Sequence, residues 1–205
     1  MGEQVGDTGG LRLLFAGRLT EEKGVRVLLE ALRLVNNEGL NVELDILGAG
    51  ELWDECQRLA SAWRGPSQLR LLGTVPYGPE FFSLLQDYHA VVVPSLSDER
   101  SRSVFDAYSQ ALPVLASRTE GLTDCIQEGV TGMLIRPGYA DDLAGLIRWA
   151  SGNKERLRTM GVAALDMAHG MTHQTIHWRR CKILLEKTGT RSGQSPTAER
   201  SGVLG

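Results

Sequence analysis

Near the start of this 205-residue chain, an apolar run typical of a strand ends at a loop that contains glycines and cations. The loop G-R-L-T-E-E-K-G at residues 17–24 follows the apolar run at 11–16 and precedes a helical pattern. Open α/β sheets bind ligands beyond the carboxyl ends of their strands, where a helix start adds N–H groups and the positive end of its dipole. Arg18 offers a planar fork of donors and Lys23 a mobile point charge. The loop therefore predicts a diphosphate site. The alternative is a solvated turn in which two neighbouring glutamates offset Lys23.

Strand and helix patterns alternate along the rest of the chain, which is typical of a parallel sheet with helices on both faces. Strands are expected over residues 11–16, 41–47, 68–72, 89–93, 114–116 and 132–135. Helices are expected over residues 24–36, from the turn at 48–50 to about 63, and over 79–86, 123–127, 140–151, 154–167 and 172–187, with one more that carries Asp106. The predicted fold class is α/β, a single Rossmann-like domain with a six-stranded parallel sheet over residues 11–187. The polar segments 1–10 and 188–205 are expected to be disordered.

Composition narrows the function classes. Hydrophobic residues make up 42% of the chain, enough for a core, and the formal net charge of −3 argues against a nucleic-acid surface. The sequence has no apolar run of membrane-spanning length and no basic, apolar leader at its start. Its three cysteines are scattered without metal-ligand spacing, so a reducing cytoplasm is the expected location.

Two carboxylates follow the strand expected at residues 89–93. Asp98 lies in the loop after that strand, and Asp106 stands eight positions further on, in the next helical pattern. Two acids placed in this way could accept hydrogen bonds from sugar hydroxyls at two points of one ligand.

With both motifs in view, the chain resembles the C-terminal, donor-binding domain of retaining GT-B glycosyltransferases, of the glycosyl transferases group 1 or family 4 type. That family has G-R-L-x-x-x-K-G after a strand, and later P-S-x-x-E-G-F-G-x-x-x-x-E-A-x-A-x-G-x-P-V. Residues 17–19 and 23–24 match the first pattern, and Pro94-Ser95, Asp106-Ala107 and Pro113-Val114 fix the register of the second. The resemblance runs from about residue 11 to about residue 186.

The chain departs from the family pattern at the sugar end of the site. Asp98 and Asp106 replace the two family glutamates, which shortens the reach of each carboxylate by one methylene. The family's G-F-G is Glu99-Arg100-Ser101 here, and Ala111 replaces a later glycine. The lost glycines would have let backbone approach the ligand closely. A shifted donor preference, slow catalysis and lost catalysis all fit these changes.

The resemblance implies a nucleoside diphosphate sugar as donor substrate, with Arg18, Lys23 and Asp98 as catalytic residues. Arg18 and Lys23 would neutralise the diphosphate, Asp98 would contact the donor sugar, and Asp106 would hold the ribose. It implies no cofactor and no metal. The implied substrate-binding residues are Gly17, Arg18, Lys23, Gly48, Gly50, Thr74, Val75, Asp98, Ser101, Arg102 and Asp106. For the glycines at 48 and 50 and for residues 74–75, a plain turn or loop without ligand contact stays the alternative.

In the family a second Rossmann-like domain precedes this one and binds the acceptor, whereas about ten residues precede the first strand here. The chain is therefore expected to be half of a two-chain enzyme, a degraded gene product, or a free-standing binder. The alternative function is a non-catalytic nucleotide-sugar-binding or regulatory subunit. Ile176, Ile183 and Leu184 form a stripe expected to pack on a partner chain or a second copy. Nucleic acid is not an expected partner, and peripheral membrane contact stays open.

Overall fold

The computed structural model describes residues 9–97 and 100–170. Its six strands are all parallel and lie in the order β3-β2-β1-β4-β5-β6. Their bounds are β1 Leu11–Ala16, β2 Val42–Leu47, β3 Gln68–Gly73, β4 Ala90–Val93, β5 Val114–Ser117 and β6 Gly132–Ile135. The helices are η1 Glu21–Lys23, α1 Val25–Asn37, α2 Trp53–Ala62, α3 Pro79–Leu85, α4 Arg102–Ser109, α5 Glu120–Thr123, α6 Ala140–Gly152 and α7 Lys154–His169.

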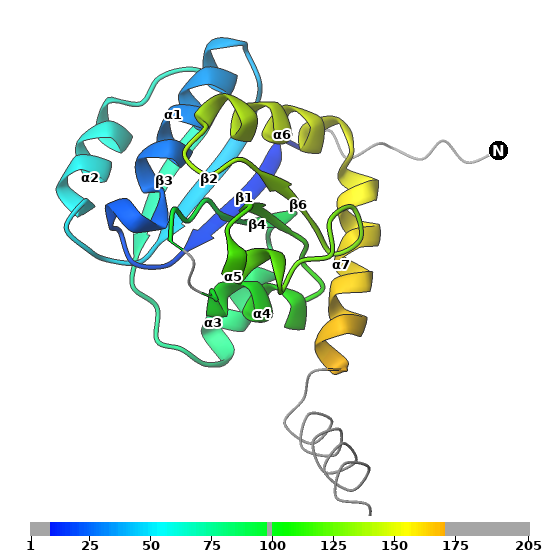
Figure 1. The fold of residues 1–205 in the computed structure, drawn as a ribbon. Helices are drawn as coiled ribbons and strands as arrows, with labels where there is room; N and C mark the ends of the chain where they lie inside the picture. Colours follow the sequence, from blue (N-terminus) through cyan, green and yellow to red (C-terminus); the bar gives the residue numbers. More distant parts are fainter. Residues whose placement is uncertain (1–8, 98–99, 171–205) are drawn as a thin grey trace, which may run out of the picture. The chain divides into compact units, whose positions relative to one another are not determined.

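Helices cover the sheet on both faces (Figure 1). One face packs against α1, α2 and α6 through Leu13 and Ile46, and the other against α3, α4 and α7 through Leu14 and Val91. The central strands β4 and β5 are buried at every position, because parallel strands covered on both faces lose contact with water on both sides. This explains why both are continuous apolar runs in the sequence.

The chain reverses its direction of travel across the sheet at β1. It first builds outward through β2 to β3 and then returns to place β4 on the other side of β1. The loops that follow β1 and β4 therefore leave neighbouring strands in opposite directions, and such a switch point opens a crevice beyond the carboxyl ends of the strands.

The structure confirms the six predicted strands to within one residue at each end. It corrects the short helix predicted at residues 123–127, which lies instead at Glu120–Thr123. The N–H of Gln127 donates to Thr131 Oγ1 over 3.0 Å, and Glu128 forms an isolated parallel bridge with Gly132. These residues therefore belong to the turn that leads into β6. The predicted helix 172–187, its apolar stripe, the tail, and residues 1–8 lie outside the described residues.

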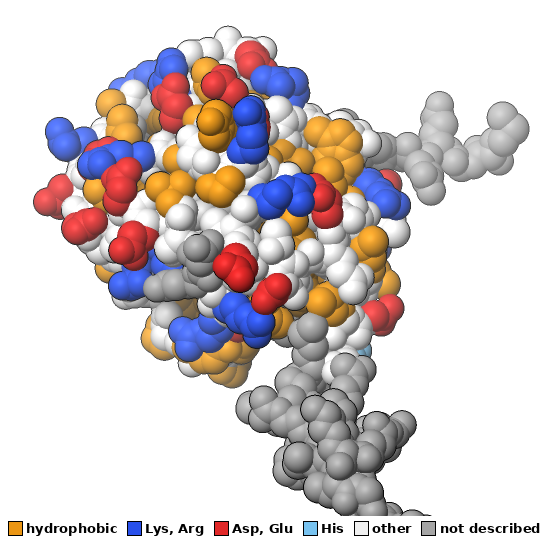
Figure 2. All heavy atoms as spheres, in the orientation of Figure 1, with side chains coloured by type: hydrophobic (Ala, Val, Ile, Leu, Met, Phe, Trp, Pro, Cys, Tyr) orange, Lys and Arg blue, Asp and Glu red, His pale blue; other side chains and the backbone are white. Residues whose placement is uncertain are grey.

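Acidic and basic side chains are intermingled over the face shown in Figure 2. Within residues 9–97 and 100–170, no helix combines the length and the apolarity that a bilayer span requires.

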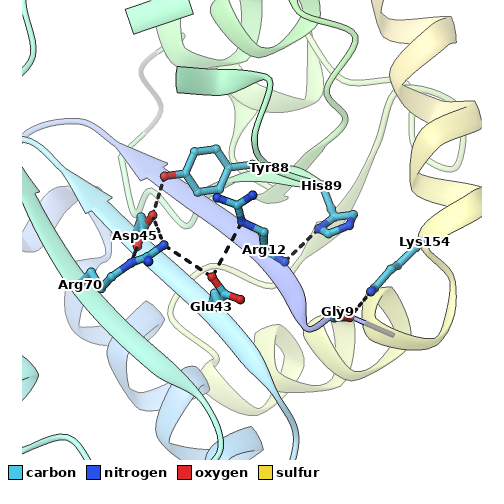
Figure 3. A network of polar contacts seen from close by, with 8 residues as sticks. All are labelled: Gly9, Arg12, Glu43, Asp45, Arg70, Tyr88, His89 and Lys154. Carbon is cyan, nitrogen blue, oxygen red and sulfur yellow. Dashed lines mark hydrogen bonds and ion pairs between the residues drawn. The ribbon is translucent and has the colours of Figure 1, made fainter. Parts of the chain in front are cut away.

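A buried carboxylate joins three segments on one face of the sheet (Figure 3). Asp45 of β2 is 2% exposed, and the Arg70 guanidinium of β3 pairs with it through Nε–Oδ1 and Nη2–Oδ2 distances of 2.7 and 2.8 Å. The hydroxyl of Tyr88, just before β4, donates to Asp45 Oδ2 over 2.6 Å. Removing one partner of such a buried network is costly, because the remaining charge is left uncompensated.

We predict that Tyr88→Phe lowers the free energy of unfolding by about 1–3 kcal/mol, because Asp45 loses a donor while the buried ring is kept. Urea unfolding measures the change. Tyr139→Phe is the matched control, since the Tyr139 side chain is exposed, and its effect should stay within about 0.5 kcal/mol. Equal effects of the two substitutions would show that the Tyr88 hydroxyl does not stabilise the network.

Candidate functional site

A cavity of about 750 Å³ opens beyond the carboxyl ends of β1, β2 and β4, at the switch point of the sheet. Its walls come from the loops after β1, β2, β3 and β4 and from the first two turns of α4. The lining residues are Phe15, Ala16, Gly17, Arg18, Lys23, Leu47, Gly48, Ala49, Thr74, Val75, Tyr77, Phe81, Val92, Val93, Ser95, Arg100, Ser101, Arg102, Ser103 and Asp106. This is where the topology alone predicts a ligand site.

The loop after β1 is bound tightly to the loop after β4. Gly24 has φ +68°, and a Cβ built on it would overlap the carbonyl oxygen of Pro94. The carbonyl oxygen of Glu22 accepts hydrogen bonds from the Leu96 N–H at 2.7 Å and from Ser95 Oγ at 3.1 Å. A glycine at position 24 therefore lets the two loops meet, and the neighbouring Lys23 lines the cavity.

Gly48 is required for a different close approach. A Cβ at Gly48 would overlap the carbonyl oxygen of Gly17, and one at Gly50 would come within 2.5 Å of the carbonyl oxygen of Leu19. Both glycines thus have a packing role that needs no ligand. Gly48 lines the cavity, whereas Gly50 is absent from the described lining.

Asp106 faces the cavity from α4 and is 8% exposed. Its Oδ1 accepts a hydrogen bond from the hydroxyl of Tyr77 over 2.8 Å, and its Oδ2 lies 4.0 Å from Arg102 Nε. Burial raises the pKa of the Asp106 carboxyl above its ordinary 3.8, opposed by the Tyr77 hydrogen bond and the Arg102 charge. When ionised, the carboxylate therefore carries its charge in a largely buried position, next to two side chains that stabilise that charge.

The structure brings together on one cavity nine of the residues predicted from sequence: Gly17, Arg18, Lys23, Gly48, Thr74, Val75, Ser101, Arg102 and Asp106. Asp98 and Glu99 lie outside the described residues.

Three polar lining residues were missed by the sequence reasoning. Tyr77 and Arg100 line the cavity, and Ser103 Oγ donates to the carbonyl oxygen of Ala16 over 2.7 Å. An aromatic residue between the glycines at 73 and 78, in a loop already singled out, was the available signal for Tyr77.

Positive charge dominates the described part of the lining. Arg18, Lys23, Arg100 and Arg102 are cationic, and Asp106 is the acid among the described lining residues. Arg100 also pairs with Asp124 at 2.8 Å. A cavity lined by one sign of charge concentrates ligands of the opposite sign, so this arrangement favours an anionic ligand that also carries hydroxyl donors.

The family model described as glycosyl transferases group 1 matches residues 10–153. This chain belongs to that family. Among curated relatives, it is 27% identical over 183 residues to the amylovoran biosynthesis glycosyltransferase AmsK of Erwinia amylovora, covering 86% of this chain and 45% of AmsK. It is 31% identical over 182 residues to a D-inositol 3-phosphate glycosyltransferase of Arthrobacter sp. (strain FB24), covering 87% of this chain and 42% of that enzyme. The chain thus spans less than half the length of these relatives.

Solved structures confirm the Rossmann-like fold and its likeness to GT-B glycosyltransferases. The crystal structure of Anabaena Alr3699/HepE in complex with UDP superposes with a TM-score of 0.71 at 22% identity, covering 87% of this chain and 49% of that one. Sucrose-phosphate synthase of Thermosynechococcus elongatus gives a TM-score of 0.72 at 18% identity, covering 88% and 46%. The family match over residues 10–153 confirms the group 1 glycosyltransferase resemblance drawn from the sequence.

We compare the free energy of unfolding of the native chain with that of Asp106→Asn, which has no acid at this position. We predict that the native value minus the variant value falls as the pH rises from below 3.8 through the pKa of Asp106 in the folded chain. Because that pKa is raised, the folded state holds the proton more tightly than the unfolded state. The resulting stabilisation is complete below the ordinary pKa and is lost as the pH rises through the folded one.

Urea unfolding at a series of pH values measures this difference, which should be constant above the window. Asp166→Asn, at an exposed position of α7, controls for the loss of an acid elsewhere. A difference that rises with pH across the same window would contradict the effect of burial at Asp106.

Proposed function

We propose that this chain is the donor-binding half of a glycosyltransferase and that it binds a nucleoside diphosphate sugar in the cavity at the switch point. The observation that carries the proposal is the convergence on one cavity of Arg18 and Lys23 from the β1 loop with Asp106 from α4. The cations suit a diphosphate, and the carboxylate suits the hydroxyls of a ribose. Relatives and solved neighbours support the assignment, since the HepE structures hold UDP in one case and UDP-glucose in another.

The reaction proposed is sugar transfer with retention of configuration. Negative charge grows on the diphosphate as the bond from the sugar to the phosphate oxygen breaks, and Arg18 and Lys23 would stabilise that charge as it forms. We propose that the donor phosphate itself assists the incoming acceptor, so that no general base comes from this domain. We also propose that the two cations serve in place of a metal ion. Asp98 is assigned to the donor sugar by the family motif. Buried thiols at Cys56 and Cys125 suit a reducing compartment such as the cytoplasm.

A second candidate function is non-catalytic binding of a nucleotide sugar. It is favoured by the sugar end of the site, where Ser101 stands on the cavity wall in place of a family glycine and Arg100 in place of the family phenylalanine. A side chain at position 101 removes the close backbone approach that glycine permits. Binding of a nucleotide sugar with no transfer in the presence of an acceptor domain would select this function.

We predict that Arg18→Ala and Lys23→Ala each weaken the binding of a nucleoside diphosphate by about 1.5–3 kcal/mol, the value of a charge-assisted contact. Binding of the corresponding nucleoside should hardly change, because it carries no phosphate. Calorimetry with UDP, ADP and GDP measures both, and Arg158→Ala on α7, outside the cavity lining, controls for general loss of positive charge. Equal losses for nucleoside and diphosphate would reject the phosphate role of these two cations.

We also predict that the 205 residues alone bind a nucleoside diphosphate weakly and transfer no sugar. The described residues build one wall of a cleft, and positioning an acceptor against the donor carbon contributes roughly 7–11 kcal/mol of barrier reduction in good cases. Assays with radiolabelled nucleotide sugars, with and without an acceptor-type Rossmann-like domain, measure transfer. Turnover onto a defined acceptor by the 205 residues alone would refute the need for a second half, whether in the same polypeptide or in another chain.

A further inference from the structure

We propose that Ser103 is a positioning residue, which holds the wall that binds the diphosphate and the wall that binds the ribose at a fixed separation. The proposal rests on the proposed function, because it concerns how one nucleoside diphosphate reaches both walls. The observation behind it is a hydrogen bond between segments 87 residues apart: Ser103 Oγ, in the first turn of α4, donates to the carbonyl oxygen of Ala16 over 2.7 Å. Ala16 is the last residue of β1, and both residues line the cavity.

Each end of this hydrogen bond adjoins a residue assigned to the ligand. Ala16 is followed by Gly17 and then by Arg18, the cation assigned to the diphosphate. Ser103 stands three positions before Asp106 on α4, and helical residues three apart are neighbours on one side of the helix. The bond therefore joins the segment that carries the phosphate-binding cation to the helix that carries the ribose-binding carboxylate.

The two ends of α4 are held by different contacts. Toward the C-terminal end, the buried Tyr108 side chain brings its hydroxyl to 2.7 Å from Thr131 Oγ1. In the first turn, Val104 packs into the core, and the N-cap residue Ser101 makes no side-chain capping hydrogen bond. Apolar packing is non-directional, so it does not decide which polar atoms meet. The Ser103 hydrogen bond supplies that direction at the end of α4 that borders the cavity.

A fixed separation matters only to a ligand that touches both walls. A nucleoside diphosphate places its phosphates at one wall and its ribose at the other, and walls that are ordered beforehand spare the complex the cost of ordering them on binding. The second contact then forms as an intramolecular step. A nucleoside alone or a pyrophosphate alone needs one wall. Loss of the Ser103 hydroxyl should therefore weaken the whole nucleotide more than either of its halves.

The test is Ser103→Ala, which removes the hydroxyl and leaves a good helix former in the first turn of α4. Calorimetry at neutral pH compares three ligands: the tightest-binding diphosphate among UDP, ADP and GDP, its nucleoside, and inorganic pyrophosphate. The diphosphate should bind about three- to tenfold more weakly than to the native chain, the range spanned by one neutral hydrogen bond. The nucleoside and pyrophosphate should stay within about 1.5-fold of their native affinities, because neither spans the two walls.

Two further variants separate positioning from a general effect on the helix. Ser103→Thr keeps the hydroxyl and should bind the diphosphate within about twofold of the native chain. Ser109→Ala is the matched control, because Ser109 lies on the same helix, outside the cavity lining, and its Oγ also donates over 2.7 Å, to the carbonyl oxygen of Asp106 within α4. This variant should leave the affinities for all three ligands unchanged. Urea unfolding of each variant verifies that it is folded.

Four results would overturn the inference: an unchanged affinity of Ser103→Ala for the diphosphate; an equal loss for the nucleoside or for pyrophosphate, which would make Ser103 a direct ligand contact; a Ser103→Thr chain that binds as weakly as Ser103→Ala; or loss of the fold in Ser103→Ala, which would make the hydroxyl a requirement of the fold. A native chain that binds none of the three diphosphates contradicts the proposed function itself. Native binding with an unchanged Ser103→Ala contradicts this inference alone, so the two failures are distinguishable.

Discussion

The contact between Gly24 and the backbone of Pro94 is the constraint on which the candidate site depends. It lets the loop after β1 meet the loop after β4, where Glu22 accepts two further hydrogen bonds from that loop. Since β1 and β4 are neighbours only because the chain reverses its direction across the sheet, this contact joins two motifs separated by some seventy residues. Lys23 and Asp106, a cation and a carboxylate from distant parts of the sequence, line one cavity as a result.

The glycines of the loop after β2 likewise allow two loops to approach each other closely. Gly48 and Gly50 leave room for the carbonyl oxygens of Gly17 and Leu19, so the loop after β2 lies directly against the loop after β1. A side chain at either position would push the two loops apart. These glycines therefore shape the site through protein–protein packing, and their presence in a motif is explained before any ligand is considered.

Apolar runs and the alternation of strand and helix patterns were enough to predict the six strands, because parallel strands buried on both faces show little else in sequence. Arg18, Lys23 and Asp106 were predictable because each lies just beyond a strand or on the following helix. Tyr77 was not, since a single tyrosine in a loop has no periodicity and its partner stands 29 residues away. The Asp45–Arg70–Tyr88 network depends on which strands become neighbours, so strand-by-strand analysis could not have found it. The short helix at 120–123 was misplaced because its four residues are too few to carry a helical period.

Asp106 has to satisfy two requirements that oppose each other. Its position on the cavity wall removes water and so favours the protonated form, whereas a carboxylate that accepts ligand hydroxyls has to be ionised. The Tyr77 hydrogen bond and the Arg102 charge both stabilise the ionised form, and Arg102 also stacks on the Tyr77 ring. A tyrosine donor and a nearby arginine are therefore parts of one arrangement, which favours the ionised form of a buried carboxylate against the effect of its burial.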